Sequence, residues 1–556
     1  MAAAVGSSST DVHTLHYREK ELSRMQSLED ASQDGDPRAM CQLAGLLMDG
    51  TDNIDSDPQR AIELYEKAIK QGSLEAQYSL ACVLEEGLPG VNRDIPRAVG
   101  LYENGIKAED MHAMHGLALL LEDGDDGIEA DPQRAVQLLE AAHDRGHPDA
   151  VFTLAAILKR GADRVEKDMN KVIAILESAA QAGSSAAMNE LGTIYEIGDE
   201  DEEIEPDPPR AVEMYERAVD AGNSTAMCNL GRLLRDGAPG VPMDTVAAVS
   251  LYETAIGRGE NEALGTLATM MQDGVGDLPA NPVRAVELYE QAIARGVNES
   301  LHDLACLLEE GRDDELPADA PRAVKLYERS IQMGDTYSVY RLAILYLKGA
   351  PGVPKNHERA ADLFEEAIVA QHGAAMYDYG CLLEQGTDVI KADMSKAIDL
   401  YRQAAEQRHP SSLLRWARIK LMGEHGVEAD REEALELYNF AVEMNSTDAM
   451  CKLGDLFLSG EGGVEKDPGQ AHLLFEQAIE LGDIDAYNRL GMLLEKGVAG
   501  VPADAPRACW LYEQAVDMGN EEALYLLAEL LEKGAEGVEK DPTRAQQLRE
   551  DAEMRA

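Results

Sequence analysis

One glycine recurs along the whole chain at an almost constant spacing. The step between copies is 37 residues, except for one step of 39 and one of 38. A period between 20 and 50 residues is typical of a solenoid of stacked repeats. Stacked repeats form long continuous surfaces, so the pattern favours binding over catalysis. The fourteen glycines are Gly50, Gly87, Gly124, Gly161, Gly198, Gly237, Gly274, Gly311, Gly349, Gly386, Gly423, Gly460, Gly497 and Gly534.

Each unit, numbered 1 to 14 by its closing glycine, has the pattern of two amphipathic helices. In repeat 2, Ala76, Leu80, Ala81 and Leu84 share one helical face. Gly87 then closes this first helix, because glycine adopts a left-handed turn without steric cost. The second helix begins at an Asp, which caps its free amides, and it usually ends at a second glycine.

The spacing within the pattern separates a rigid part of each unit from a variable part. From an anchor position near the start of one second helix, basic in most repeats, to the next closing glycine there are always 27 residues. All length changes therefore fall in the loop inside a repeat, as expected of a surface loop. Six positions before every closing glycine stands Gly or Ala, which predicts that two helices touch closely there.

The composition restricts the classes of partner. The net charge is −54 over 556 residues, so phosphate backbones and anionic membrane surfaces would be repelled. We expect neither nucleic acid binding nor membrane insertion. No signal peptide and no apolar run of membrane-spanning length stands out, which favours the cytoplasm, with the nucleus as an alternative. The seven cysteines do not recur in pairs, so we interpret them as reduced packing residues.

The repeat resembles the Sel-one-like repeat family, a branch of the tetratricopeptide-type helical solenoids. The resemblance covers roughly residues 36–556 and implies an all-α fold, an α/α superhelical solenoid of about 14 two-helix repeats of 37 residues. It also implies a protein-binding scaffold or adaptor rather than an enzyme. The matching positions include Ala187, Leu191, Gly192, Gly463, Val464, Asp467, Ala471, Ala404 and Ala405.

Two other functions are implied by relatives of this kind. One is an accessory, substrate-recruiting subunit of a ubiquitin-ligase complex in degradation at the endoplasmic reticulum. The other is a hydrolase of the bacterial cysteine-rich repeat type, which the missing cysteine pairs make the least favoured. The oligomeric state stays open.

The two ends of the chain have the character of caps. We expect a disordered tail over residues 1–15, a capping helix over 16–35, the solenoid over 36–543, and a last helix with a C-terminal cap over 544–556. In the capping helix Leu28, Ala31 and Gly35 occupy the positions that Tyr65, Ala68 and Gly72 hold in a repeat.

No catalytic constellation stands out. The sequence has no zinc-protease motif, phosphate-binding loop, cysteine pair of redox type or nucleophile elbow. His112 and His115 lie one turn apart, but two ligands without a third are a weak metal site. We therefore predict no catalytic residue, no cofactor and no metal.

Repeats 9 to 13 depart from the common pattern. Eight positions before the closing glycine, where no base occurs in repeats 1 to 8, they carry four bases in five copies. The same stretch collects 10 of the 26 aromatic residues. Arg and Tyr are enriched in interface hot spots, so we expect a basic, aromatic-lined groove for an acidic or phosphorylated peptide. The candidate residues are Tyr337, Tyr340, Arg341, Tyr377, Arg415, Arg418, Lys452 and Arg489.

The alternative interpretation is structural. The bases would then pair with neighbouring carboxylates, and the aromatic residues would fill a locally wider core. Repeats 9 to 11 also carry Gln371, Arg408 and Asn445 in place of the glycine that ends the second helix, which suggests a change of pitch.

Overall fold

The computed structural model describes residues 8–51, 54–125, 127–199, 201, 204–312, 315–387 and 389–555. Within these ranges it contains 29 α-helices and no strand of more than an isolated bridge. The all-α repeat fold expected from the sequence is confirmed. The chain divides into two compact units, residues 1–270 with 274–280, and residues 271–273 with 281–556.

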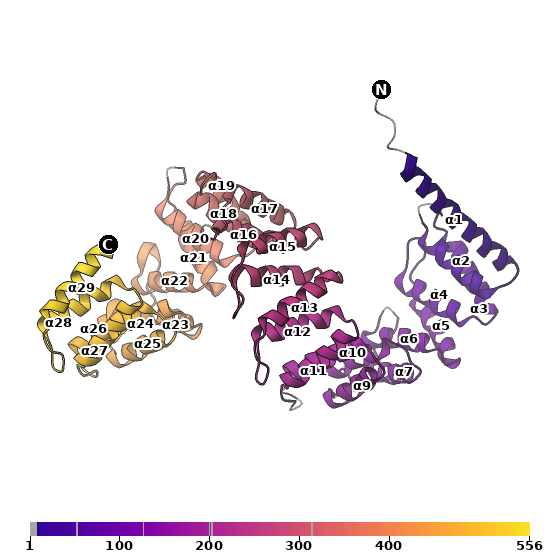
Figure 1. Ribbon diagram of the computed structural model, residues 1–556, viewed down its shortest axis with the longest axis horizontal. Helices are drawn as coiled ribbons and strands as arrows, with labels where there is room; N and C mark the ends of the chain where they lie inside the picture. Colours follow the sequence, from indigo (N-terminus) through magenta and orange to yellow (C-terminus); the bar gives the residue numbers. More distant parts are fainter. Residues whose placement is uncertain are drawn as a thin grey trace, which may run out of the picture. The chain divides into compact units, whose positions relative to one another are not determined.

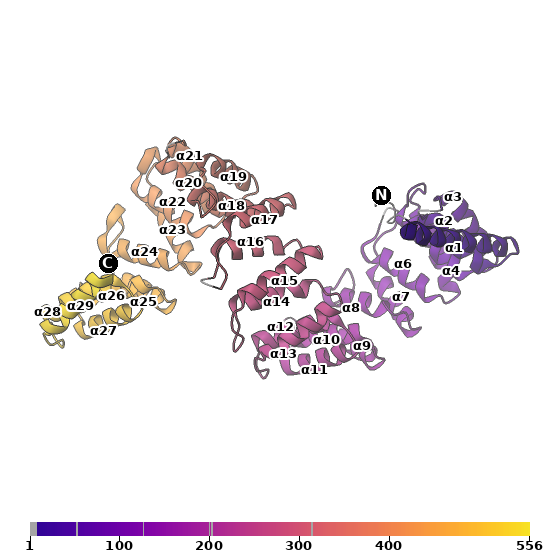
Figure 2. The same cartoon turned by 45° about the horizontal axis from the view of Figure 1, so that its top comes forward.

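In the first unit each repeat is a pair of helices of similar length that pack side by side (Figures 1 and 2). The first helices are α2 (Pro37–Asp49), α4 (Leu74–Glu86), α6 (Met111–Asp123), α8 (Ala150–Arg160), α10 (Ser185–Ile197), α12 (Ser224–Asp236) and α14 (Glu262–Asp273), within which the division falls. The second helices are α3 (Pro58–Lys70), α5 (Ile95–Lys107), α7 (Pro132–Asp144), α9 (Met169–Gln181), α11 (Pro208–Asp220) and α13 (Thr245–Gly257).

The second unit continues the same alternation. Its first helices are α16 (Ser300–Glu310), α18 (Thr336–Lys348), α20 (Gly373–Gln385), α22 (Pro410–Met422), α24 (Thr447–Ser459), α26 (Ile484–Lys496) and α28 (Glu521–Lys533). Its second helices are α15 (Pro282–Ala294), α17 (Ala320–Gln332), α19 (His357–Val369), α21 (Met394–Glu406), α23 (Arg431–Glu443), α25 (Pro468–Glu480), α27 (Ala505–Asp517) and α29 (Pro542–Arg555). Two short 3-10 helices, η1 (Glu424–Gly426) and η2 (Glu461–Gly463), lie in the loops of repeats 11 and 12.

The closing glycines adopt the conformation that the sequence predicts. All fourteen have a positive φ, between 59° and 73°. At Gly198 a Cβ atom would also lie 2.5 Å from the carbonyl oxygen of Ile204, so the returning loop leaves no room for a side chain. The turn therefore requires glycine for two reasons, its backbone conformation and its lack of volume.

The small residue six positions before the closing glycine contacts the aromatic ring of the second helix in the same repeat. A Cβ atom on Gly491 would lie 2.5 Å from Tyr512, and one on Gly454 would lie 2.5 Å from Phe475. Both rings are fully buried. The close approach of two helices at this position is confirmed, and it explains why no larger residue than Ala occurs there.

Ion pairs join neighbouring second helices. The basic residue near the start of a second helix pairs with a carboxylate on the preceding second helix, as in Arg210 with Glu177 at 2.8 Å and Arg544 with Glu513 at 2.7 Å. These side chains are largely exposed, so each pair contributes at most about 1 kcal/mol. Their repetition nevertheless sets a common register between neighbouring repeats.

Helix α1 (Ser8–Gln33) packs against α2 at the start of the first unit (Figure 2). Its C-terminal half resembles a second helix, since Glu29 pairs with Arg60 at 2.7 Å and Gly35 has a φ of 89°. The helix includes residues 8–15, which the sequence assigns to a disordered tail, and residues 1–7 lie outside the described residues. The division into tail, cap and solenoid stays a prediction.

The turns that lack glycine keep the glycine conformation. Gln371, Arg408 and Asn445 end their second helices with φ of 62°, 63° and 58°. The substitutions in repeats 9 to 11 therefore leave the local turn unchanged and add backbone strain instead.

Three histidines meet where repeats 3 and 4 pack together. The ring of His147 stacks on His115 with centroids 4.4 Å apart and meets His112 edge-on at 4.9 Å. His147 is buried, and His115 lies 3.1 Å from the hydroxyl of Thr153. Among the described residues no group of three or more His, Cys, Asp or Glu is arranged to hold a metal ion. The three rings pack against one another at this junction.

Because burial disfavours the charged forms of His115 and His147, the stability of this region should depend on pH. Burial lowers the pKa of His115 and of His147, and the neighbouring histidines lower that of His147 further, against the opposing carboxylate of Asp149. The unfolded state then takes up protons first, so stability is complete above about pH 6.5 and falls as the pH drops below it. We expect His115→Gln to show a smaller loss between pH 7 and pH 5.5 in urea unfolding. An unchanged pH dependence would contradict this assignment.

Candidate functional site on the first helices of repeats 9 to 13

The eight residues predicted from the sequence lie on five consecutive first helices of the second unit, α18, α20, α22, α24 and α26. They line four separate cavities rather than one. Tyr337 lines a cavity of about 400 Å³, Tyr340 and Arg341 line one of about 530 Å³, and Arg489 lines one of about 500 Å³. The other four, Tyr377, Arg415, Arg418 and Lys452, meet in a cavity of about 510 Å³, which we call the central pocket.

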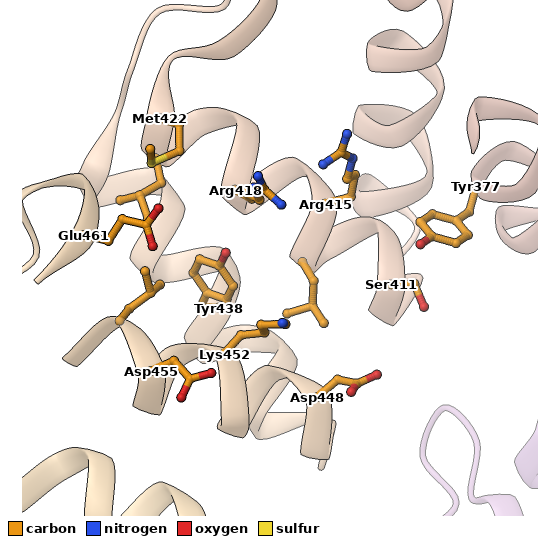
Figure 3. A pocket seen from close by; sticks show the side chains of 13 residues that line it. Tyr377, Ser411, Arg415, Arg418, Met422, Tyr438, Asp448, Lys452, Asp455 and Glu461 are labelled. Atoms are coloured by element: carbon orange, nitrogen blue, oxygen red, sulfur yellow. The ribbon is translucent and has the colours of Figure 1, made fainter. Parts of the chain in front are cut away.

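The central pocket lies between α22 and α24, with Tyr438 of α23 in its lining (Figure 3). Arg415 and Arg418 project from α22, and Asp448, Lys452 and Asp455 project from α24. Glu461 of η2 completes the charged lining, which holds three basic and three acidic residues. The pocket therefore carries both signs of charge, whereas the sequence pattern indicated a basic groove.

Two of the predicted bases are held by carboxylates of the preceding repeat. Arg341 lies 3.1 Å from Glu309, and Arg415 pairs with Glu384. Burial disfavours the charged form of Arg415, but the carboxylate of Glu384 outweighs this and raises the pKa of Arg415. These ion pairs agree with the structural interpretation, in which the bases pair with neighbouring carboxylates.

The other three bases differ in how they are engaged. Arg489 pairs with Asp455 at 3.2 Å. Arg418 has only a distant partner, Glu424 at 3.8 Å, and its side chain is 61% exposed. No described residue forms an ion pair with Lys452, which is exposed on α24. Lys452 and Arg418 are therefore the bases that remain accessible to a ligand.

The aromatic residues of this stretch serve two different purposes. Tyr379 and Trp416 stand seven positions before their closing glycines, where the other twelve repeats carry Leu, and both are buried. Tyr340 stacks on His372 with centroids 4.7 Å apart, and Tyr337 is 66% exposed. The aromatic residues of this stretch thus supply core packing as well as an exposed ring, that of Tyr337.

Tyr438 lines the central pocket but is not among the eight site residues predicted from the sequence. It is one of the ten aromatic residues in the stretch that departs from the common pattern. The signal that identifies it lies two positions before the closing glycine of its repeat, where Leu421 replaces the Glu that repeats 2, 3, 5, 8, 10, 13 and 14 carry. Only the structure shows that this position faces the hydroxyl of the second-helix tyrosine.

The family model of the Sel1 repeat matches fourteen successive segments between residues 37 and 548. The chain belongs to the Sel1 repeat family. The number of matched segments equals the number of closing glycines, so the repeat boundaries derived from the glycine agree with the family pattern. No curated protein matches this Sel1 repeat chain.

Solved structures of other repeat proteins are similar to this Sel1 repeat protein over all or part of its length. A protective antigen of uropathogenic Escherichia coli with an SLR fold is 22% identical, with a TM-score of 0.51, and the match covers 92% of this chain and 97% of that one. A Sel1 repeat protein from Oxalobacter formigenes is 30% identical over 41% of this chain and 92% of its own, with a TM-score of 0.36. The similarity to the Escherichia coli antigen shows that the two chains share a fold.

Two further observations on the Sel1 repeat chain concern membrane-spanning helices and the cysteines. None of the helices in the described ranges is long and apolar enough to cross a membrane. All seven cysteines are free, and those on first helices are buried or half-buried, in keeping with a packing role.

Proposed function

We propose that this Sel1 repeat protein is a non-enzymatic scaffold that binds partner proteins through the first helices of repeats 9 to 13. A peptide segment with acidic or phosphorylated residues is the partner that the accessible bases and the exposed ring of Tyr337 favour. Arg and Tyr contribute most where they are anchored by neighbours, as Arg415 is by Glu384. The observation that carries the proposal is the central pocket, where four of the predicted residues meet, among them Lys452, which pairs with no carboxylate in the described part of the chain.

Charge reversal at Lys452 tests this proposal. Lys452→Glu changes an exposed side chain without an ion pair, so the fold should persist while an acidic partner is repelled. Arg415→Glu is less informative, because it would place two carboxylates against each other at Glu384. We expect Lys452→Glu to lose the partners that co-purify with the wild-type chain, by at least about tenfold in yield.

A matched control is Lys70→Glu, which reverses the charge of another exposed lysine at the end of α3. It lowers the net charge by the same amount and should leave co-purification unchanged. If the two variants recover the same partners in quantitative mass spectrometry, the first-helix face of repeats 9 to 13 is not the binding surface.

A further inference from the structure

A hydrogen bond between the second-helix tyrosine and a glutamate recurs through the repeats. The glutamate stands two positions before the closing glycine and accepts the bond from the hydroxyl of the same repeat. The bond is found from Tyr102 to Glu85 at 2.8 Å, Tyr215 to Glu196 at 2.9 Å, Tyr327 to Glu309 at 2.6 Å, Tyr401 to Glu384 at 2.8 Å and Tyr512 to Glu495 at 3.1 Å.

In the second unit, a base from the next repeat often joins this pair. Arg341 binds the carboxylate of Glu309, which also accepts from Tyr327. Arg415 in the same way binds Glu384, which also accepts from Tyr401. We call this arrangement the Tyr–Glu–base cluster, in which one carboxylate is held by a phenol and a cation.

Between repeats 11 and 12 the cluster lacks its carboxylate. Leu421 stands where the glutamate would be, while the tyrosine, Tyr438, and the base, Lys452, are both present. No described residue forms a hydrogen bond with the hydroxyl of Tyr438 or an ion pair with Lys452. One substitution therefore leaves two groups without their usual anion.

The space beside these two groups is open. Both line the central pocket of about 510 Å³, together with Leu421. Figure 3 shows the hydroxyl of Tyr438 pointing toward the side of the pocket from which Arg418 projects. Leu421 itself is covered by the loop of repeat 12, since a Cβ atom on Gly462 would lie 2.5 Å from its Cγ. A group from outside the chain can thus reach the phenol and the ammonium from the open side.

We propose that the central pocket binds the side-chain carboxylate of an Asp or Glu in a partner peptide, which takes the place of the missing glutamate between Tyr438 and Lys452. This inference rests on the proposed function and identifies the chemical group that the site recognises. Arg418 supplies a second cation beside it. In the other two clusters a tyrosine and an arginine at the same repeat positions hold one carboxylate, so the ligand completes an arrangement that the fold already forms, with Lys452 as the base.

A carboxylate fits the pocket better than a phosphate does. Asp448, Asp455 and Glu461 also line the pocket, so additional negative charge on the ligand is penalised. A phosphorylated side chain carries close to two negative charges, whereas a carboxylate carries one. A phosphopeptide is therefore the alternative outcome of the experiment.

The test is a selection of random peptides displayed on phage against the full chain, followed by binding measurements with the selected synthetic peptides. Displayed peptides have no free C-terminus, so any carboxylate they present belongs to a side chain. We expect the wild type to select peptides with an acidic residue at one fixed position. Replacing that residue by its amide should weaken binding by about tenfold or more.

Three variants locate the carboxylate. Tyr438→Phe removes only the hydroxyl and should weaken binding about fivefold, and Lys452→Met should weaken it by at least about tenfold. Leu421→Glu restores the cluster within the chain and should abolish binding of the acidic peptide. Leu421→Gln has the same shape without the charge and should bind more tightly than Leu421→Glu. Tyr252→Phe, at another buried second-helix tyrosine, should bind as the wild type does.

The outcomes separate this inference from the proposed function. If no peptide is selected, or if the selected peptides bind Lys452→Glu normally, both fail. If the peptides bind this face but tolerate Tyr438→Phe, Leu421→Glu and the amide exchange, only the carboxylate site is wrong. Peptides that gain affinity when the acid is exchanged for phosphoserine would assign the pocket to phosphate instead.

Discussion

Phe475→Ala is expected to lower the free energy of unfolding of the C-terminal repeats by about 3–5 kcal/mol. The ring of Phe475 is fully buried in a core that extends over repeats 11 to 14. It packs against Gly454, which has no side chain to fill the space that the ring would leave. Since each repeat of a solenoid contacts mainly its neighbours, the loss should stay local and produce a separate early unfolding transition.

Urea unfolding followed by amide hydrogen exchange measures this effect, because exchange reports which repeats open first. Leu473→Ala on the same helix is the control, since Leu473 is 52% exposed and its truncation should cost less than about 0.5 kcal/mol. Equal destabilisation by the two variants, or a single transition for Phe475→Ala, would show that the repeats do not depend on this contact.

Gly198→Val should cost about 2–4 kcal/mol, because it combines a strained backbone with a steric clash. The φ of Gly198 is 71°, a conformation that β-branched residues avoid. The Cβ atom would also lie 2.5 Å from the carbonyl oxygen of Ile204. The glycine that defines the repeat is thus predicted to tolerate substitution poorly.

Gly183→Val measures the cost of backbone strain in the absence of a steric clash. Gly183 has a φ of 97°, but a Cβ atom there would meet nothing within 4 Å. We expect this variant to lose only the strain contribution, about 1–3 kcal/mol, in thermal or urea unfolding. A Gly198→Val variant no less stable than Gly183→Val would mean that the loop moves away to admit the side chain.

The fold was predictable because its determinants repeat. Gly87 and its copies mark the turn, and Gly454 or its Ala equivalents mark the contact between helices, so fourteen observations support each assignment. Helix α1 was less predictable, since it has no copy against which to align. Its start at Ser8 lies within a stretch whose composition indicates disorder.

The residue types that line the site could be predicted from the sequence, but the ion pairs that its bases form could not. A base at a variable position of the first helix, such as Arg415 or Lys452, is visible in the sequence. Whether it is paired depends on a carboxylate of the preceding repeat, at Glu384 in one case and absent at Leu421 in the other. Such contacts join residues about 31 positions apart and become apparent only when neighbouring repeats are stacked.

The most direct test of the account is photo-crosslinking of the full chain in cells from one residue on each surface. Benzoylphenylalanine at Ser411, which lines the central pocket, samples the first-helix face, and the same residue at Leu473 samples the exposed side of α25. We expect partner proteins to crosslink from Ser411 and few to crosslink from Leu473. We expect Lys452→Glu to abolish the crosslinks from Ser411. Crosslinks that form from Leu473 but not from Ser411, or that persist in Lys452→Glu, would contradict the account.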